Sequence, residues 1–179
     1  QRQVIHATKD IETPKVLSAK NKILELNPNV KVEAVKGLFN ESNAKELVSS
    51  YDFIVDATDN FDAKFLINDT CVELGKPFVH GSLLRWEGNA FTYVPGSACY
   101  RCIYPTPPEK GTVPSSSQAG VIGAIAGMVG TAQAAEVVKY FTGAGELLTN
   151  QLLHFDALTM TFTKMKIRKR DKCSVCKGK

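Results

Sequence analysis

The sequence predicts an α/β fold in which a mostly parallel sheet is flanked by helices. Three observations support this prediction: helical and strand-like segments alternate, a buried-type apolar run ends abruptly at polar residues, and the chain contains no internal repeat. With 179 residues, 44% of them hydrophobic and 22% charged, the chain has the composition of a globular protein. We therefore expect a single domain over residues 1–179.

The first third of the chain contains four predicted elements. In order they are a helix over 14–27, a strand over 30–34, a short helix over 42–50 and a strand over 53–55. Pro14 suits the first turn of its helix, and Thr13 before it is a typical capping residue. Because Phe53-Ile54-Val55 is apolar without alternation, we expect a parallel strand that is buried on both faces.

A polar elbow, Asp56-Ala57-Thr58-Asp59-Asn60, follows that strand. Open α/β sheets bind ligands outside the carboxyl ends of their strands, so this elbow is a candidate binding site. The Asp59 carboxylate is the kind of hard oxygen ligand that holds Mg²⁺ beside a nucleotide. It can equally cap the helix predicted over 61–74. The residues alone leave both interpretations open.

After a strand predicted over 78–81, a long apolar helix is expected over about 119–141. Gly120, Gly123, Gly127 and Gly130 lie along one of its faces, so a neighbour, either the sheet or a partner subunit, can approach closely. The uninterrupted apolar stretch is shorter than the ~18 residues that a membrane span needs. We therefore expect a core helix and no membrane contact.

Four of the five cysteines form two Cys-x-x-Cys pairs, Cys99/Cys102 and Cys173/Cys176. Four thiolates suit one structural Zn²⁺, which prefers tetrahedral sulfur or nitrogen ligands. The 70 residues between the pairs far exceed the roughly 15–20 of a compact zinc ribbon, so the metal would join a tail to a distant loop. Two redox dithiols or two disulfides are the alternatives.

The charge distribution and the N-terminal sequence bear on nucleic-acid binding and on cellular location. The net charge is +4, and the basic run from Lys164 to Arg170 contains no aromatic residues. Aromatic side chains usually accompany basic ones where single-stranded nucleic acid binds, so we expect no nucleic-acid partner. The start lacks both Met and an apolar leader, from which we expect a truncated or processed chain in the cytoplasm.

Several segments together resemble the ThiF/MoeB/HesA family, which adenylylates ubiquitin-like sulfur-carrier proteins and is related to the adenylation domains of ubiquitin-activating enzymes. The matching segments, in chain order, are Arg2-Gln3, Pro14-Lys15, Thr58-Asp59-Asn60, Phe65-Leu66-Ile67-Asn68, Gly81-Ser82, Arg85-x-Glu87-Gly88, Cys99-Tyr100-Arg101-Cys102, Gln118-Ala119-Gly120-Val121 and Cys173-x-x-Cys176. They cover essentially the whole chain.

The resemblance implies a Rossmann-like fold, a structural zinc held by the four cysteines, and a homodimer. It implies that Arg2 and Lys15 contact ATP phosphates, that Asp59 binds Mg²⁺ and ATP, and that Asn60 lies beside the nucleotide. The implied reaction is ATP-dependent adenylylation of the C-terminal glycine of a carrier ending in Gly-Gly. Such carriers supply sulfur for thiamine or for the molybdenum cofactor.

Two departures from the family pattern qualify these expectations. The family's first βαβ unit, with its glycine-rich loop, would lie before Gln1, so we expect the N-terminal βαβ part to be missing. Ser116 stands where many relatives have a cysteine that forms a thioester or persulfide, and a hydroxyl is a weaker nucleophile. The alternative function is a noncatalytic carrier-binding or dimerising module that keeps the fold and the zinc site.

Overall fold

The computed structural model describes residues 2–109, 111–114 and 116–177, with the backbone alone for Ser116 and Ser117. The chain forms two compact units, Gln1–Phe39 and Asn40–Lys179. The single domain expected over residues 1–179 stays a prediction.

The first unit contains a short 3-10 helix, η1 (Thr8–Asp10), and the helix α1 (Lys15–Leu26). The predicted helix is confirmed, but its N-cap is Pro14 and not Thr13, and no side chain caps it. The strand predicted over 30–34 is wrong, because these residues are irregular and take part in none of the strand pairings among the described residues. Alternating apolar residues become a strand only when a neighbouring strand accepts their backbone hydrogen bonds.

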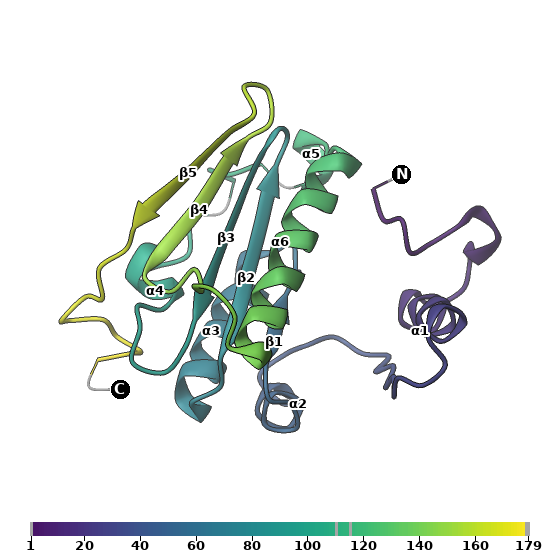
Figure 1. Ribbon diagram of the computed structural model, residues 1–179, viewed down its shortest axis with the longest axis horizontal. Helices are drawn as coiled ribbons and strands as arrows, with labels where there is room; N and C mark the ends of the chain where they lie inside the picture. Colours follow the sequence, from purple (N-terminus) through teal and green to yellow (C-terminus); the bar gives the residue numbers. More distant parts are fainter. Residues whose placement is uncertain (1, 110, 115, 178–179) are drawn as a thin grey trace. The chain divides into compact units, whose positions relative to one another are not determined.

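The second unit is built on a five-stranded sheet of order β1-β2-β3-β4-β5 (Figure 1). Its strands are β1 (Ile54–Asp56), β2 (Phe78–Leu84), β3 (Glu87–Tyr93), β4 (Gln151–Asp156) and β5 (Thr161–Lys166). β1 and β2 are parallel, and the other three pairings are antiparallel. The expectation of a mostly parallel sheet is therefore wrong for the described residues. Only Arg85-Trp86 joins β2 to β3, and a connection that short forces antiparallel strands.

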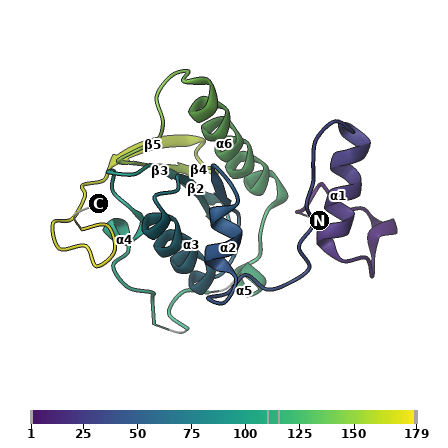
Figure 2. The same ribbon diagram turned by 90° about the horizontal axis from the view of Figure 1, so that it is seen from below.

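Helices cover both faces of this sheet. In Figure 2, α6 (Gly123–Thr142) lies on one face, and α2 (Ala44–Ser49) and α3 (Phe61–Leu74) lie on the other. α3 is the crossover between the parallel strands β1 and β2, as a βαβ unit requires. Two single-turn helices, α4 (Tyr100–Ile103) and α5 (Ser116–Ala119), complete the unit. An α/β fold with a helix-flanked sheet is thus confirmed.

The long predicted helix is divided in the structure. α5 ends at Ala119, Gly120 adopts a φ of 78°, and α6 begins only at Gly123. A residue with positive φ cannot continue a right-handed helix, so the glycine separates the two. No helix among the described residues combines the length and the apolarity that crossing a membrane requires.

Two strand glycines let α6 approach the sheet closely. A Cβ on Gly81 would lie 2.5 Å from Cδ of Gln133, and one on Gly88 would lie 2.8 Å from Cγ2 of Val129, both on α6. Gly127 and Gly130 have open space where a Cβ would be and are exposed. The expectation that the sheet packs against the glycine face of α6 is therefore wrong. Contact of that face with a partner subunit stays a prediction.

Candidate functional site

The polar elbow connects β1 to α3 and is held by a hydrogen bond on each side of Asp59. Before it, one carboxylate oxygen of Asp56 accepts from both Thr58 N at 3.0 Å and Thr58 Oγ1 at 2.7 Å. After it, Asn60 caps α3, because its Oδ1 accepts from Ala63 N at 2.8 Å. Asp59 lies between these two turns and is exposed. The interpretation of Asp59 as the helix cap is therefore wrong, since Asn60 fills that role.

Beneath the elbow, Asp56 anchors a buried polar network. His80 Nδ1 lies 2.7 Å from one carboxylate oxygen, and Lys64 Nζ lies 3.2 Å from the same atom. Lys64 also donates to Gly81 O at 2.8 Å, while Gln133 Nε2 donates to the backbone carbonyl of Asp56 at 2.7 Å. All of these side chains are buried. The network joins β1, α3, β2 and α6 at one point below the candidate site.

The charges in this network are set by burial and by the partners. Burial acts to raise the pKa of Asp56, but the hydrogen bond from His80 and the charge of Lys64 outweigh it and lower that pKa to about 2. Burial lowers the pKa of His80, so the imidazole is neutral. Because an ionised carboxylate only accepts, Nδ1 of His80 carries the proton that it donates to Asp56. Asp56 is thus a fixed buried anion.

The other residues expected at the nucleotide are divided between the two units. Asp59 and Asn60 lie together before α3 in the second unit. Arg2 and Lys15, both exposed, belong to the first unit, where Lys15 is the first residue of α1. Ser116 begins α5, and its side chain lies outside the described residues.

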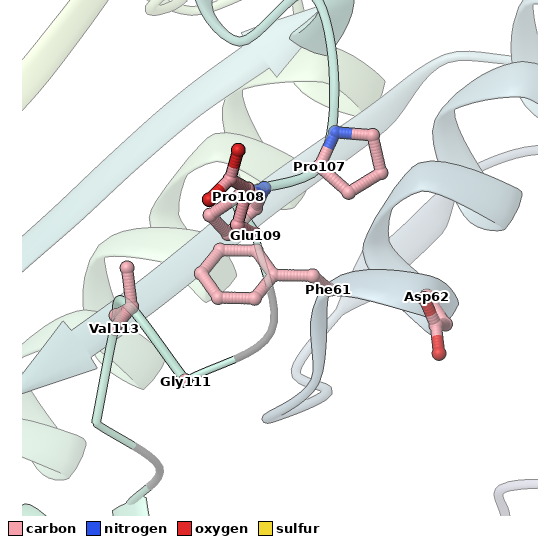
Figure 3. A pocket seen from close by; sticks show the side chains of 7 residues that line it. All are labelled: Phe61, Asp62, Pro107, Pro108, Glu109, Gly111 and Val113. Carbon is pink, nitrogen blue, oxygen red and sulfur yellow. The ribbon is translucent and has the colours of Figure 1, made fainter.

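A pocket of about 220 Å³ borders the start of α3. Its walls come from α3 and from the segment that follows the first cysteine pair, through Phe61, Asp62, Pro107, Pro108, Glu109, Gly111 and Val113. The ring of Phe61 points toward Pro108 and Glu109 (Figure 3). Since Phe61 directly follows the cap residue Asn60, this pocket adjoins the elbow.

The four cysteines of the two pairs form one buried cluster, as the spacing predicted. Their sulfur atoms all lie within 4.8 Å of one another, and the Cys99–Cys173 and Cys102–Cys176 pairs are 3.7 and 3.5 Å apart. Four sulfurs around one zinc at a Zn–S distance of about 2.3 Å would lie roughly 3.8 Å apart. All four are free thiols, which excludes disulfides between them in this structure. The set therefore fits one tetrahedral Zn²⁺.

Local electrostatics favour the thiolate at one member of this cluster, Cys173, whereas burial raises the pKa of Cys99 and that of Cys176, the latter to about 11. Burial acts to raise the pKa of Cys173, but backbone N–H groups of Cys176 and Val175 outweigh it and lower that pKa to about 7. Turns of this kind favour the thiolate that a metal requires. Burial raises the pKa of Cys71 to about 12. Cys71 lies inside α3 and belongs to the core.

The loop of the first cysteine pair docks on α3. Tyr100 N donates to Asn68 Oδ1 at 2.8 Å. The Arg101 guanidinium donates from Nε and Nη2 to the carboxylate of Asp69 and lies 4.7 Å from the centre of the Phe65 ring. A bidentate pair fixes orientation as well as distance. The same helix therefore carries the elbow at its start and the cysteine loop on its side.

Sequence reasoning missed the network below the elbow. Lys64 and Gln133 are not among the site residues that the sequence predicts, yet both side chains contact Asp56. The signal was present: both side chains interrupt an otherwise apolar segment, and a buried polar side chain requires partners.

Comparisons with known proteins place the chain in context. It matches the model of the ThiF family over residues 1–175. It is 45% identical over 176 residues to the SAMP-activating enzyme E1 of Haloferax volcanii, covering 98% of this chain and 65% of that protein. It is 41% identical over 181 residues to the sulfur carrier protein adenylyltransferase of Thermus thermophilus, covering 98% and 67%.

Among solved structures, the crystal structure of E. coli MccB with ATP matches with a TM-score of 0.82 and 21% identity, covering 98% of this chain and 54% of that one. At this identity the match supports the fold alone. The chain thus spans about two thirds or less of the length of the proteins that it matches here.

Proposed function

Because this chain belongs to the ThiF family, we propose that it is part of an enzyme that uses ATP to adenylylate the C-terminal glycine of a ubiquitin-like sulfur-carrier protein. One observation supports this most directly. The motif Thr58-Asp59-Asn60 forms an exposed acidic elbow at the carboxyl end of β1, where open sheets bind ligands, in a chain 41% identical to a sulfur carrier protein adenylyltransferase.

In the proposed reaction, an oxygen of the glycine carboxylate attacks the α-phosphorus of ATP. The bond from that phosphorus to the bridging oxygen breaks, pyrophosphate leaves with the bonding electrons, and an acyl-adenylate remains. The carboxylate is already ionised at neutral pH, so the protein supplies no base. Its task is to position the groups and stabilise negative charge, and Arg2 and Lys15 are the proposed cations that contact the phosphates.

We propose Asp59 as the ligand of Mg²⁺, with Asn60 beside it at the nucleotide. An exposed carboxylate held between two hydrogen-bonded turns has the hard oxygen chemistry that this ion prefers. Bound there, Mg²⁺ would neutralise part of the phosphate charge. Asp59 would provide the carboxylate ligand, because the side-chain oxygen of Asn60 already accepts the hydrogen bond that caps α3.

Two finer points remain part of the proposal. The carrier supplies sulfur for thiamine or for the molybdenum cofactor, and exchange assays with a carrier of each kind would separate these roles. Ser116 takes the place of the family's nucleophilic cysteine, so we expect adenylylation without a thioester or persulfide at this position. In that case a Ser116→Cys variant would leave the adenylation rate unchanged.

ATP–pyrophosphate exchange tests the function. The full-length protein should catalyse exchange only when a carrier ending in Gly-Gly is present, and Asp59→Ala should reduce it on the order of a thousandfold through lost charge stabilisation. Asp52→Ala, at another exposed aspartate just before β1, is the matched control and should not reduce exchange. Near-normal exchange by Asp59→Ala would show that the metal site is misplaced. Carrier binding without any exchange would instead support a noncatalytic carrier-binding or dimerising module.

We also propose a homodimer and a cytoplasmic location. The outward side of α6 carries Gly127, Gly130, Val138 and Phe141, and the last two are each 60% exposed. Such a small-residue and apolar surface suits contact with a second helix. The five free cysteines fit a reducing compartment. Light scattering that gives a monomer at micromolar concentration would contradict the dimer.

A further inference from the structure

We infer that Thr58 is a positioning residue for Asp59: it holds the elbow in place by binding the buried Asp56 carboxylate with both its N–H and its hydroxyl. The inference rests on the proposed function, because it assigns Asp59 a metal to bind. Thr58 itself would contact neither substrate nor metal.

The geometry of the elbow carries the first step. Both donors of Thr58 reach the same oxygen, Asp56 Oδ1, at 3.0 and 2.7 Å, which fixes the backbone and the side chain of the residue directly before Asp59. On the other side, the cap by Asn60 fixes the residue directly after it. Asp59 is therefore the exposed residue between two anchored neighbours. The two anchored neighbours hold its carboxylate in place, near enough to Lys64 for its charge to act on that lysine.

The second step is the rigidity of the anchor. The Asp56 carboxylate is 1% exposed and is also bound by Lys64 and His80, while Gln133 holds its backbone carbonyl. These partners come from three further elements, α3, β2 and α6. A buried ion pair is often no more stabilising than apolar residues of similar volume. A gain in folding stability therefore does not account for this network, whereas holding the elbow in place does.

A purely structural Thr58 would behave like any other threonine whose hydroxyl donates to a buried carboxylate. Thr92 offers that comparison, because its Oγ1 donates to Oε2 of the buried Glu136 at 2.5 Å. Thr92 lies on β3, in a separate hydrogen-bonded group with Leu148 N. Thr58→Val and Thr92→Val thus each remove a hydroxyl that donates to a buried carboxylate, one at the elbow and one away from it.

The experiment compares Thr58→Val, Thr58→Ser and Thr92→Val in the full-length protein by ATP–pyrophosphate exchange with carrier, at varied ATP and Mg²⁺. Thr58→Val should lower kcat/KM on the order of a hundredfold, as small misplacements of a reacting group do, and should raise the Mg²⁺ concentration that gives half the maximal rate. Thr58→Ser keeps the hydroxyl and should restore both values. Thr92→Val should keep them.

Hydrogen exchange of the backbone amides at 57–60 provides a readout that needs no activity. In the Thr58→Val variant these amide hydrogens should exchange with solvent faster than in the wild type, while in Thr92→Val their rates should be unchanged. A Thr58→Val protein with wild-type kinetics, or with losses equal to those of Thr92→Val, would overturn the inference. If the wild type shows no ATP–pyrophosphate exchange with carriers, the proposed function fails. Unchanged amide hydrogen exchange in Thr58→Val would separately refute the positioning role.

Discussion

Removing metal from the four-cysteine cluster should destabilise the second unit by an amount that its topology sets. A bound zinc would join the loop at Cys99 and Cys102 to the tail at Cys173 and Cys176, and 70 residues separate the inner two. A crosslink of this kind restricts the unfolded chain, and the effect grows slowly with the length of the closed loop.

For a loop of this length, the chain-entropy relation for crosslinks gives about 4 kcal/mol in the free energy of unfolding. For a protein of this size, each kcal/mol corresponds to roughly 2–4 °C in Tm, so we expect a fall of about 8–16 °C. The tail should be released first, because the zinc is its covalent-strength link to the loop, while its described hydrogen bonds there are weak ones such as that from Arg170 N to Cys102 Sγ at 3.5 Å.

The assay combines metal analysis with thermal unfolding before and after treatment with a chelator. The wild type should contain one zinc per chain and should lose stability on chelation, whereas Cys173→Ser should be less stable already and insensitive to the chelator. Cys71→Ala is the matched control, since Cys71 is buried outside the cluster and should leave both zinc content and chelator sensitivity intact. Well under one zinc per chain, or an unchanged Tm after chelation, would refute the reasoning.

Two further predictions concern the packing and the buried charges. Gly88→Ala should lower the free energy of unfolding in urea by about 1–3 kcal/mol, because its Cβ would overlap Phe155 and Val129, while Gly127→Ala has open space and should raise it by about 0.5–1 kcal/mol; equal effects would contradict the close packing of α6. Stability should also fall in acid. Burial lowers the pKa of His80 in the folded state, so below pH 6.5 His80 binds a proton more readily in the unfolded chain. Between pH 3.8 and about 2, Asp56 likewise binds a proton more readily in the unfolded chain, so the urea midpoint should decrease through both pH ranges. An Asp56→Asn variant that retains the decrease in the lower range would contradict this.

The parts of the fold that the sequence predicted well are those with a local signal. α3 has the predicted bounds because Asn60 caps its start and Gly75, with a φ of 64°, ends it. The direction of the strands had no such signal, since the apolar pattern at 78–81 is the same for parallel and antiparallel neighbours. Val55 shows the same limit: the apolar run predicts burial on both faces, but in the edge strand β1 the side chain of Val55 is 48% exposed.

The candidate sites follow the same division. The four cysteines were found because metal ligands have a characteristic spacing, and the structure brings them together across 70 residues. The elbow was found because it ends an apolar run. The network beneath it was not, because Lys64, His80 and Gln133 are far apart in sequence and each is ambiguous alone. Only the packing of three elements on β1 shows that all three meet at Asp56.

α3 relates the two candidate sites to each other. At its start it carries the elbow, in its second turn it supplies Lys64 to the buried Asp56, and one turn later Asn68 and Asp69 hold the cysteine loop. A helix rises 1.5 Å per residue, so these contacts lie within roughly 15 Å of one another along one rigid element. The loop that carries two of the zinc ligands also provides, further along, the proline wall of the pocket beside Phe61. A zinc site here would therefore stabilise one wall of the pocket that adjoins the elbow, although no metal ligand belongs to that pocket.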